Sequence, residues 1–313
     1  DAEYDSLTRE IVDELSPELQ NHILDSSYRF RHIAKKLKRT VGRSARVLGK
    51  HANRGRFRPI AVELTFGPGG QVPGLAFTLA DGTRMELAGR IDRLDAATDE
   101  QGQTYLRVID YKSGSSKLTP LDVYYGIKLQ LLTYLHVAEK FAADLGLTGA
   151  KAAGTLYFRI YDPLQTTEQP LPTNVAEAMG LEAYRMQGVL LNDPVAIDLM
   201  DTGLRGRSIL IPVTINANGT PRKSDNIWSA EELERMRQHL EDMFVAAGNE
   251  IIAGNIAIAP YRLNKETACR FCPYTAVCQF DALLPENNYR WLRQLSREEV
   301  MLQLEQAPGG EED

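Results

Sequence analysis

The sequence predicts an α/β fold in which helices flank a mixed β-sheet, followed by a C-terminal segment that contains cysteines. Two observations support this class. Apolar residues alternate with other residues in the strand candidate 58–66, and two further strand candidates, 85–94 and 105–111, flank a polar loop. A helical segment, 121–145, then separates these strands from a fourth candidate, 153–160. The order β-β-β-α-β implies a mixed sheet with helices packed on it.

The segment before the first strand is predicted to be a basic amphipathic helix, 23–48. Its apolar residues recur at three- and four-residue spacing: Phe30, Ile33, Leu37, Val41, Ala45 and Leu48. A bend is expected at Gly42. Residues 29–58 hold 12 of the 36 Lys and Arg and no acidic residue, which leaves 24 basic against 42 acidic residues elsewhere. We interpret this concentrated positive charge as an attraction for nucleic acid; the alternative is a solvated helix face.

Turn signals separate the other predicted elements. The first strand ends in a glycine-rich turn, 67–70, and a polar loop, 95–103, joins the next two strands as a long hairpin. The later elements are a helix at 175–191, a strand at 209–213 with a hairpin turn at 216–219, and a helix from 229 to about 252. Ser229 and Glu232 form a capping box for this last helix, and Gly254 ends it.

No segment resembles an exposed linker between domains. Residues 1–313 are therefore predicted to form one domain, with a core at about 23–161 and a C-terminal part at about 162–313 that ends in an acidic tail. The apolar share of 43% and the charged share of 25% are those of an ordinary soluble protein. With no apolar run of about 18 residues and no secretory signal, a cytoplasmic location without membrane contact is expected.

Acidic and basic side chains converge on two strand candidates. Residues two apart in a strand face the same side, so Asp110 and Lys112 project together. In a hairpin, Asp92 lies on the adjacent strand. Burying an Asp among apolar neighbours is costly unless it is paired or binds a metal. The alternative, common for an isolated Asp-x-Lys pattern, is a surface ion pair.

Such oxygen ligands suit Mg²⁺ or Mn²⁺, which would polarise a phosphodiester and generate hydroxide from water. Lys112 would position or help to deprotonate that water and offset charge in the transition state. Glu63, in the first strand, is the candidate third carboxylate, with a structural salt bridge as the alternative. ATP hydrolysis is not expected, because the nearest approach to a phosphate-binding loop, 42–51, has the wrong glycine spacing and ends in His51.

These motifs resemble the RecB-like branch of the PD-(D/E)xK nuclease superfamily, which implies a restriction-endonuclease-like fold. The matching residues are Gly89-Arg90-Ile91-Asp92-Arg93, Asp110-Tyr111-Lys112-Ser113-Gly114, and Gln130 with Tyr134. The resemblance implies that Asp92, Asp110 and the Tyr111 carbonyl bind the metal and that Lys112 is catalytic. It also implies that Gln130 and Tyr134 support the site or the DNA; alternatively, they only link helix to sheet.

All three cysteines, Cys269, Cys272 and Cys278, lie in one C-x2-C-x5-C segment. This spacing is typical of a zinc or cluster site that takes its fourth ligand from elsewhere, and chance placement is the alternative. The segment is similar to the iron–sulfur staple at the C-terminal end of the B subunits of AddAB-type helicase–nucleases, which implies a 4Fe–4S cluster. The family's first cluster cysteine is absent here. Its G-x-x-x-H motif is not evident either, and neither His22 nor His32 has that context.

The resemblance implies a nuclease that hydrolyses single-stranded DNA, on the 5′-ended strand, as a duplex end is unwound during double-strand-break processing. The helicase–nuclease A subunit would be the partner that supplies the motor. Two alternatives stay open. One is a DNA-binding or scaffold module with impaired catalysis, which the missing histidine and cysteine favour. The other is a different iron–sulfur RecB-like nuclease, such as one for CRISPR adaptation, which the long insertion between Asp162 and Gly254 disfavours.

Overall fold

The computed structural model describes residues 2–18, 23–163, 167, 169, 172–285 and 287–306. The chain divides into two compact units that alternate along the sequence. The first unit comprises Asp1–Gly74, Ala88–Leu118 and Gln130–Ala230, and the second comprises Leu75–Leu87, Thr119–Leu129 and Glu231–Asp313. Whether the chain behaves as one domain stays a prediction. His22 and the acidic tail lie outside the described residues.

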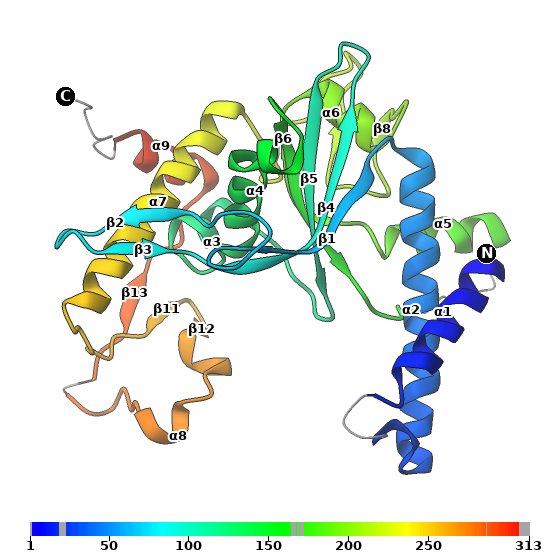
Figure 1. Ribbon diagram of the computed structural model, residues 1–313. Helices are drawn as coiled ribbons and strands as arrows, with labels where there is room; N and C mark the ends of the chain where they lie inside the picture. Colours follow the sequence, from blue (N-terminus) through cyan, green and yellow to red (C-terminus); the bar gives the residue numbers. More distant parts are fainter. Residues whose placement is uncertain are drawn as a thin grey trace. The chain divides into compact units, whose positions relative to one another are not determined.

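The first unit is built on a six-stranded sheet with the order β1-β4-β5-β6-β7-β10 (Figure 1). Its strands are β1 (Arg58–Phe66), β4 (Gly89–Thr98), β5 (Thr104–Lys112), β6 (Lys151–Arg159), β7 (Gln187–Leu191) and β10 (Ile227–Trp228). β5 and β6 pair in parallel, as do β7 and β10, whereas the other neighbours are antiparallel. The predicted mixed sheet is confirmed, and three of the four strand candidates, 58–66, 105–111 and 153–160, lie within two residues of the bounds of β1, β5 and β6.

Different helices cover the two faces of this sheet. On one face, α4 (Gln130–Lys140) lies against β5 and β6, and its Leu131 carbonyl accepts a hydrogen bond from Thr155 of β6. Helices α2 (Tyr28–Arg54) and α6 (Pro194–Met200) supply side chains to the core on the other face, which includes Ile109 and Phe158. Because α4 lies between β5 and β6 in the chain, it forms part of the crossover that parallel strands require.

Three predicted segments differ from the structure. Residues 121–145 form α3 (Pro120–Tyr124), α4 and a 3₁₀ turn (Ala142–Leu145), because Gly126 adopts a left-handed φ of 72° that ends α3. The predicted helix 175–191 is instead α5 (Thr173–Glu182) followed by strand β7, whose apolar residues are buried beside β6. The predicted strand 85–94 is divided into β3 (Arg84–Glu86) and β4.

Three further predictions concern a hairpin and two helices. The turn at 216–219 is present, but the pairing strands are β8 (Gly206–Arg207) and β9 (Thr214–Ile215) rather than 209–213. The last predicted helix is confirmed as α7 (Ala230–Ile252). The basic helix is α2, which continues through Gly42; there the missing side chain leaves room for Asp5 and Thr8 of α1 (Ala2–Leu15).

Part of the basic charge of α2 and the residues after it is paired with carboxylates from other segments. Within the described part of the chain, five of the twelve basic residues at 29–58 form such ion pairs. The pairs are Lys38–Asp13, Arg39–Asp162, Arg43–Asp162, Arg46–Asp5 and Arg54–Asp201. The segment is therefore less available to a polyanion than its sequence suggests.

The second unit contains the cysteine segment. Its three-stranded sheet has the order β12-β11-β13. The elements are β2 (Ala76–Thr78), β3, α3, α7, β11 (Tyr261–Leu263), β12 (Glu266–Thr267), a 3₁₀ turn (Ala268–Phe271), α8 (Thr275–Cys278), β13 (Arg290–Leu292) and α9 (Arg297–Gln306). Among the described residues of the chain, no helix has both the length and the apolar character needed to cross a membrane.

Acidic pH is expected to destabilise the first unit through His51 of α2. His51 is 6% exposed, and burial, reinforced by the nearby arginines 107, 93 and 54, lowers its pKa from 6.5 to about 3. As pH falls below 6.5, His51 becomes protonated in the unfolded chain, whereas in the folded protein it stays neutral until about pH 3. We therefore expect this residue to cost about 2 kcal/mol of unfolding free energy at pH 5, and none above neutral pH.

The measurement is denaturant unfolding at several pH values. His51→Leu should lose about 2 kcal/mol less stability than the parent between pH 7 and pH 5. His32→Leu, at an exposed position of the same helix, is the matched control and should retain the parental pH dependence. Equal pH dependence in all three proteins would contradict this role of His51.

Candidate active site

The candidate site begins where β4 and β5 separate. Their antiparallel ladder runs from Thr98–Thr104 to Arg93–Ile109 and ends there. The next residues along the two strands are Asp92 and Asp110. Beyond this point β4 continues to pair with β1, and β5 continues to pair with β6. Both carboxylates therefore lie at the gap between the two strands.

One backbone hydrogen bond links the two sides of this gap. The N–H of Tyr111 has no ladder partner from β4, and it donates instead to Oδ2 of Asp92 at 2.9 Å. Satisfying a backbone donor in this way avoids the cost of leaving it unpaired. The bond fixes Asp92 beside the residue that follows Asp110.

Asp110 is the most buried carboxylate of the predicted set, at 1% exposure. Its Oδ2 lies 2.6 Å from Nζ of Lys112, whereas its Oδ1 has no hydrogen-bond partner among the described residues. Burial raises the pKa of Asp110, Lys112 opposes that increase, and the Asp92 charge adds to it. A buried oxygen without a donor is well suited to accept a cation.

A chain of contacts orients Lys112. Its Nζ donates to Oε1 of Gln130 at 3.0 Å, and Nε2 of Gln130 donates to the hydroxyl of Tyr134 at 2.9 Å. The Tyr134 ring meets Phe66 of β1 edge to face, with centroids 5.8 Å apart. A Cβ on Gly89 would lie only 2.7 Å from the Phe66 ring, which explains a glycine at the start of β4. The structure thus brings Gln130 and Tyr134 to Lys112.

Glu63 occupies a different environment from the two aspartates. It lies between the register pairs Val62–Arg93 and Leu64–Ile91, so its backbone is opposite Asp92. Its side chain is 58% exposed and forms a 2.7 Å ion pair with Arg90. Its φ of 52° is left-handed, which is unusual for a non-glycine residue and is often found at functional sites.

The donor set fits one hard divalent cation. Nowhere in the described parts of the chain do three or more His, Cys, Asp or Glu side chains gather as a metal site. Side-chain ligands would therefore come from Asp92 and Asp110, with the Tyr111 carbonyl beside them. Mg²⁺ is commonly held by one or two carboxylates while it keeps several waters. The unpartnered Oδ1 of Asp110 is the observation that favours this fit.

A buried polar cluster lies on the opposite face of the same strands. Asp95 has a fully buried side chain and accepts from Arg93 at 2.6 Å and from Arg107 at 2.5 Å. Nη1 of Arg93 also donates to the hydroxyl of Tyr111 at 3.4 Å. Burial lowers the pKa of Arg107, and Asp95 opposes that shift. This cluster was not predicted; its sequence signal is the alternation of Asp92, Arg93 and Asp95, which places the last two together on the face away from Asp92.

The three cysteines are free thiols of intermediate burial in the second unit. Cys269 lies in the 3₁₀ turn, Cys272 caps it, and Cys278 ends α8. The N–H of Cys272 donates to the Cys269 carbonyl at 3.2 Å, so the backbone between them is folded into a tight turn. A zinc ion or an iron–sulfur cluster at these residues stays a prediction.

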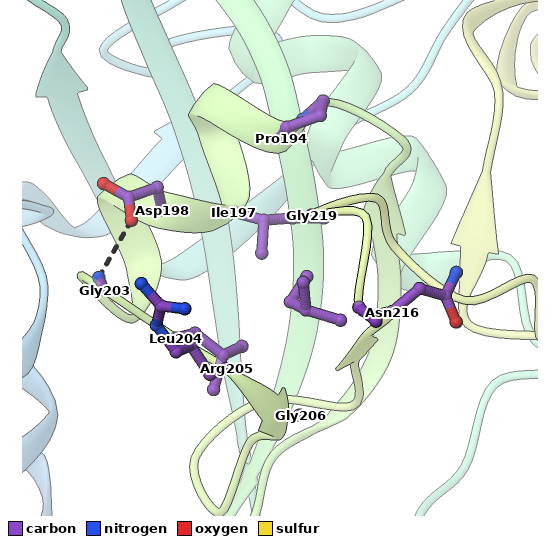
Figure 2. A pocket seen from close by; sticks show the side chains of 11 residues that line it. Pro194, Ile197, Asp198, Gly203, Leu204, Arg205, Gly206, Asn216 and Gly219 are labelled. Atoms are coloured by element: carbon purple, nitrogen blue, oxygen red, sulfur yellow. Dashed lines mark hydrogen bonds between the residues drawn. The ribbon is translucent and has the colours of Figure 1, made fainter.

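A cavity of about 550 Å³ elsewhere in the first unit contains none of the predicted site residues. It lies among α6, the segment from Gly203 to Gly206 at the start of β8, and β9 with the turn that follows it (Figure 2). The Asp198 carboxylate there accepts a hydrogen bond from the backbone N–H of Gly203 at 2.9 Å, so it stabilises the turn that follows α6. The cavity is therefore a poor candidate for the chemistry predicted from the motifs.

The fold and site define a nuclease of known class. The model of the PD-(D/E)XK nuclease superfamily matches residues 1–279, and the chain belongs to this superfamily. The mixed sheet, with Asp110 and Lys112 at the end of β5 and Asp92 across the gap, accords with that membership.

Curated relatives indicate the branch. The chain is 43% identical over 97% of its length to the B subunit of the ATP-dependent helicase/deoxyribonuclease of Desulforudis audaxviator, of which it covers 26%. It is 46% identical over 91% of its length to the protein of the same name from Pelotomaculum thermopropionicum, covering 24%. It is 41% identical over 97% of its length to the protein of the same name from Geobacillus kaustophilus, of which it covers 26%. The chain thus spans about a quarter of the length of these relatives.

Asp95 is expected to be essential for folding. Asp95→Asn keeps the volume but removes the counter-charge of the buried Arg107 guanidinium and of the Arg93 guanidinium, which is 11% exposed, and this should cost about 3–5 kcal/mol of unfolding free energy. Denaturant unfolding measures this loss. The control is Asp144→Asn, an exposed carboxylate in the 3₁₀ turn after α4, which should change stability by less than about 0.5 kcal/mol. Similar stability of the two variants would contradict a structural role for the cluster.

Proposed function

We propose that this chain is a Mg²⁺- or Mn²⁺-dependent DNA nuclease module that hydrolyses phosphodiester bonds of single-stranded DNA. The carrying observation is the buried Asp110, with its unpartnered Oδ1, flanked by Lys112 on the same strand and Asp92 across the gap. Superfamily membership supports a nuclease, and the word deoxyribonuclease in the relatives' names supports DNA as the substrate.

The residues of the chain suggest separate roles in hydrolysis. A divalent cation held by Asp92, Asp110 and the Tyr111 carbonyl supplies positive charge that polarises the phosphodiester and favours ionisation of water. Lys112, oriented by Gln130, places its ammonium group beside Asp110, where it orients the attacking water and offsets negative charge in the transition state. Glu63 would join the site as a third carboxylate only by leaving Arg90.

The wider assignment rests on the relatives. Their names support a module of a helicase–nuclease complex, with a separate helicase subunit as the partner. Processive cleavage of the 5′-ended strand during unwinding would make it an exonuclease in double-strand-break processing in the cytoplasm. The three cysteines would hold a 4Fe–4S cluster as a structural clamp, and the fourth ligand would be a group other than these three cysteines.

The second candidate is a DNA-binding scaffold with impaired catalysis. Two observations favour it: Glu63 is engaged by Arg90, and only two side-chain carboxylates among the described residues are in position to bind a metal. Cleavage assays distinguish it from the first candidate.

Loss of Asp110 or Lys112 should abolish cleavage. We expect Asp110→Asn and Lys112→Gln each to reduce the rate of Mn²⁺- or Mg²⁺-dependent cleavage of end-labelled single-stranded DNA by at least about 100-fold, because each removes a charge at the reacting phosphodiester. Chelation of the metal should have the same effect on the parent. The control Lys151→Gln, at the exposed opposite end of β6 from Arg159, should cleave within about twofold of the parent.

A parent protein that is folded and binds DNA but does not cleave it with either metal would favour the scaffold. Metal-dependent cleavage that survives in both site variants would place the chemistry elsewhere.

A further inference from the structure

A second cavity, of about 250 Å³, opens beside the candidate active site within the first unit. Five basic residues and one acidic residue line it: Lys112, Lys117, Arg159, Arg185, Arg207 and Glu182. This volume is below the roughly 300–1,000 Å³ of typical small-molecule sites, so a single anionic group fits it better than a whole cofactor. The excess of cations in a protein with a net charge of −6 needs an explanation.

The cavity is continuous with the catalytic face of the sheet. In the parallel β5–β6 register, Asp110 is opposite Tyr157 and Lys112 is opposite Arg159. Paired residues on neighbouring strands face the same side and lie about 5 Å apart. Tyr157 and Arg159 therefore extend the row of Asp110 and Lys112 by one strand, and Gln187 of β7, paired with Tyr157, extends it again.

The arginines are held in defined positions, two of them by neutral partners. The guanidinium of Arg185 donates from Nε to the Ile211 carbonyl at 2.9 Å and from Nη2 to the Val213 carbonyl at 3.4 Å. The guanidinium of Arg159 lies 3.9 Å from the centroid of the Tyr161 ring. Neither contact neutralises charge. The third, Arg207, has an acidic partner, Glu182 at 2.7 Å.

Such an arrangement matches a nucleic-acid backbone. Arginine presents planar donors that suit phosphate oxygens, and oriented arginines lose less entropy when they bind. The loop after Lys112 adds Ser115, Ser116 and a glycine to the lining, which provides small polar groups and close access to the backbone.

We infer that this cavity binds a phosphodiester of single-stranded DNA next to the scissile one, and that Arg159, Arg185 and Arg207 position the substrate for cleavage at Asp110 and Lys112. The inference rests on the proposed nuclease function, because it identifies the cavity as the neighbouring part of the same substrate track. Arg159 and Arg207 contact the DNA through exposed charges, so their replacement leaves the fold intact.

The test is the affinity of a fluorescein-labelled 20-nucleotide single strand for the double variant Arg159→Gln/Arg207→Gln, measured by anisotropy in EDTA at several salt concentrations. We expect Kd to rise about tenfold at 0.1 M salt. The slope of log affinity against log salt should fall by about 1.4, since each lost phosphate contact on a single strand contributes about 0.7.

Lys151→Gln paired with Lys140→Gln removes the same charge at positions outside the cavity lining and is the matched control. Its Kd should stay within about threefold of the parent, and its salt slope should change by less than half as much as that of the double variant. Both proteins should unfold at the parental midpoint. If the Arg159/Arg207 variant binds DNA like this control, the inference is overturned.

Parallel cleavage assays with Mn²⁺ distinguish this failure from failure of the proposed function. A parent that cleaves DNA, with KM raised about tenfold in the double variant and kcat within about twofold, supports both proposals. If the parent cleaves DNA and the double variant has the same KM and Kd as the parent, the inference about the cavity is overturned and the proposed nuclease function stands. Loss of affinity in the double variant of a parent that never cleaves supports the cavity and overturns the nuclease.

Discussion

The hydrogen bond from the Tyr111 N–H to Asp92 is the contact on which the rest of the site depends. β4 and β5 pair up to Arg93–Ile109 and then separate, each continuing with a different neighbour. A buried backbone donor at such a fork would be costly if it stayed unpaired. The Asp92 carboxylate accepts from it and so keeps the two strands in register across the gap. The same bond places Asp92 near Asp110, where its charge helps to raise the pKa of that buried carboxyl. One backbone group thus connects the fold to the chemistry.

The period of two along each strand separates catalytic from structural charge. Asp110 and Lys112 face α4, whereas Arg107, Ile109 and Tyr111 face the core beneath α2. On that second face the charge of Asp95 is matched by Arg93 and Arg107, and the Tyr111 hydroxyl contacts Arg93. The aromatic side chain of Tyr111 is therefore anchored on the structural face while its backbone serves the catalytic one. Polar groups this deeply buried favour one register, because a shift of one residue would exchange the two faces and bury unpaired charge.

Local patterns predicted the parts of the structure that depend on local geometry. β1 and α7 follow from alternation and helical periodicity, and the relation of Asp110 to Lys112 follows from their spacing. Segments set by tertiary packing were harder. Residues 187–191 form a strand because β6 offers an edge for pairing, although the same residues continue a helical pattern. The alternation of apolar residues in β1 predicts neither the left-handed backbone of Glu63 nor its ion pair with Arg90. The Asp95 cluster could be predicted only from the strand register, which places Arg107 of β5 directly opposite Asp95 of β4.

The distribution of basic residues along the sequence likewise does not show where positive charge is available for a ligand in the folded protein. The densest basic segment, 29–58, meets carboxylates from α1, from Asp162 and from Asp201, which the sequence places far away. The cavity beside Lys112 draws its arginines from three separate segments, none of them conspicuously basic, and holds two of them by carbonyl groups and a tyrosine ring rather than by acids. A run of lysines and arginines therefore measures how much charge a segment carries, but not how much of it is left for a ligand. For a polyanion that must approach Asp110, the charge that matters is the local excess of basic over acidic groups that the fold creates beside it.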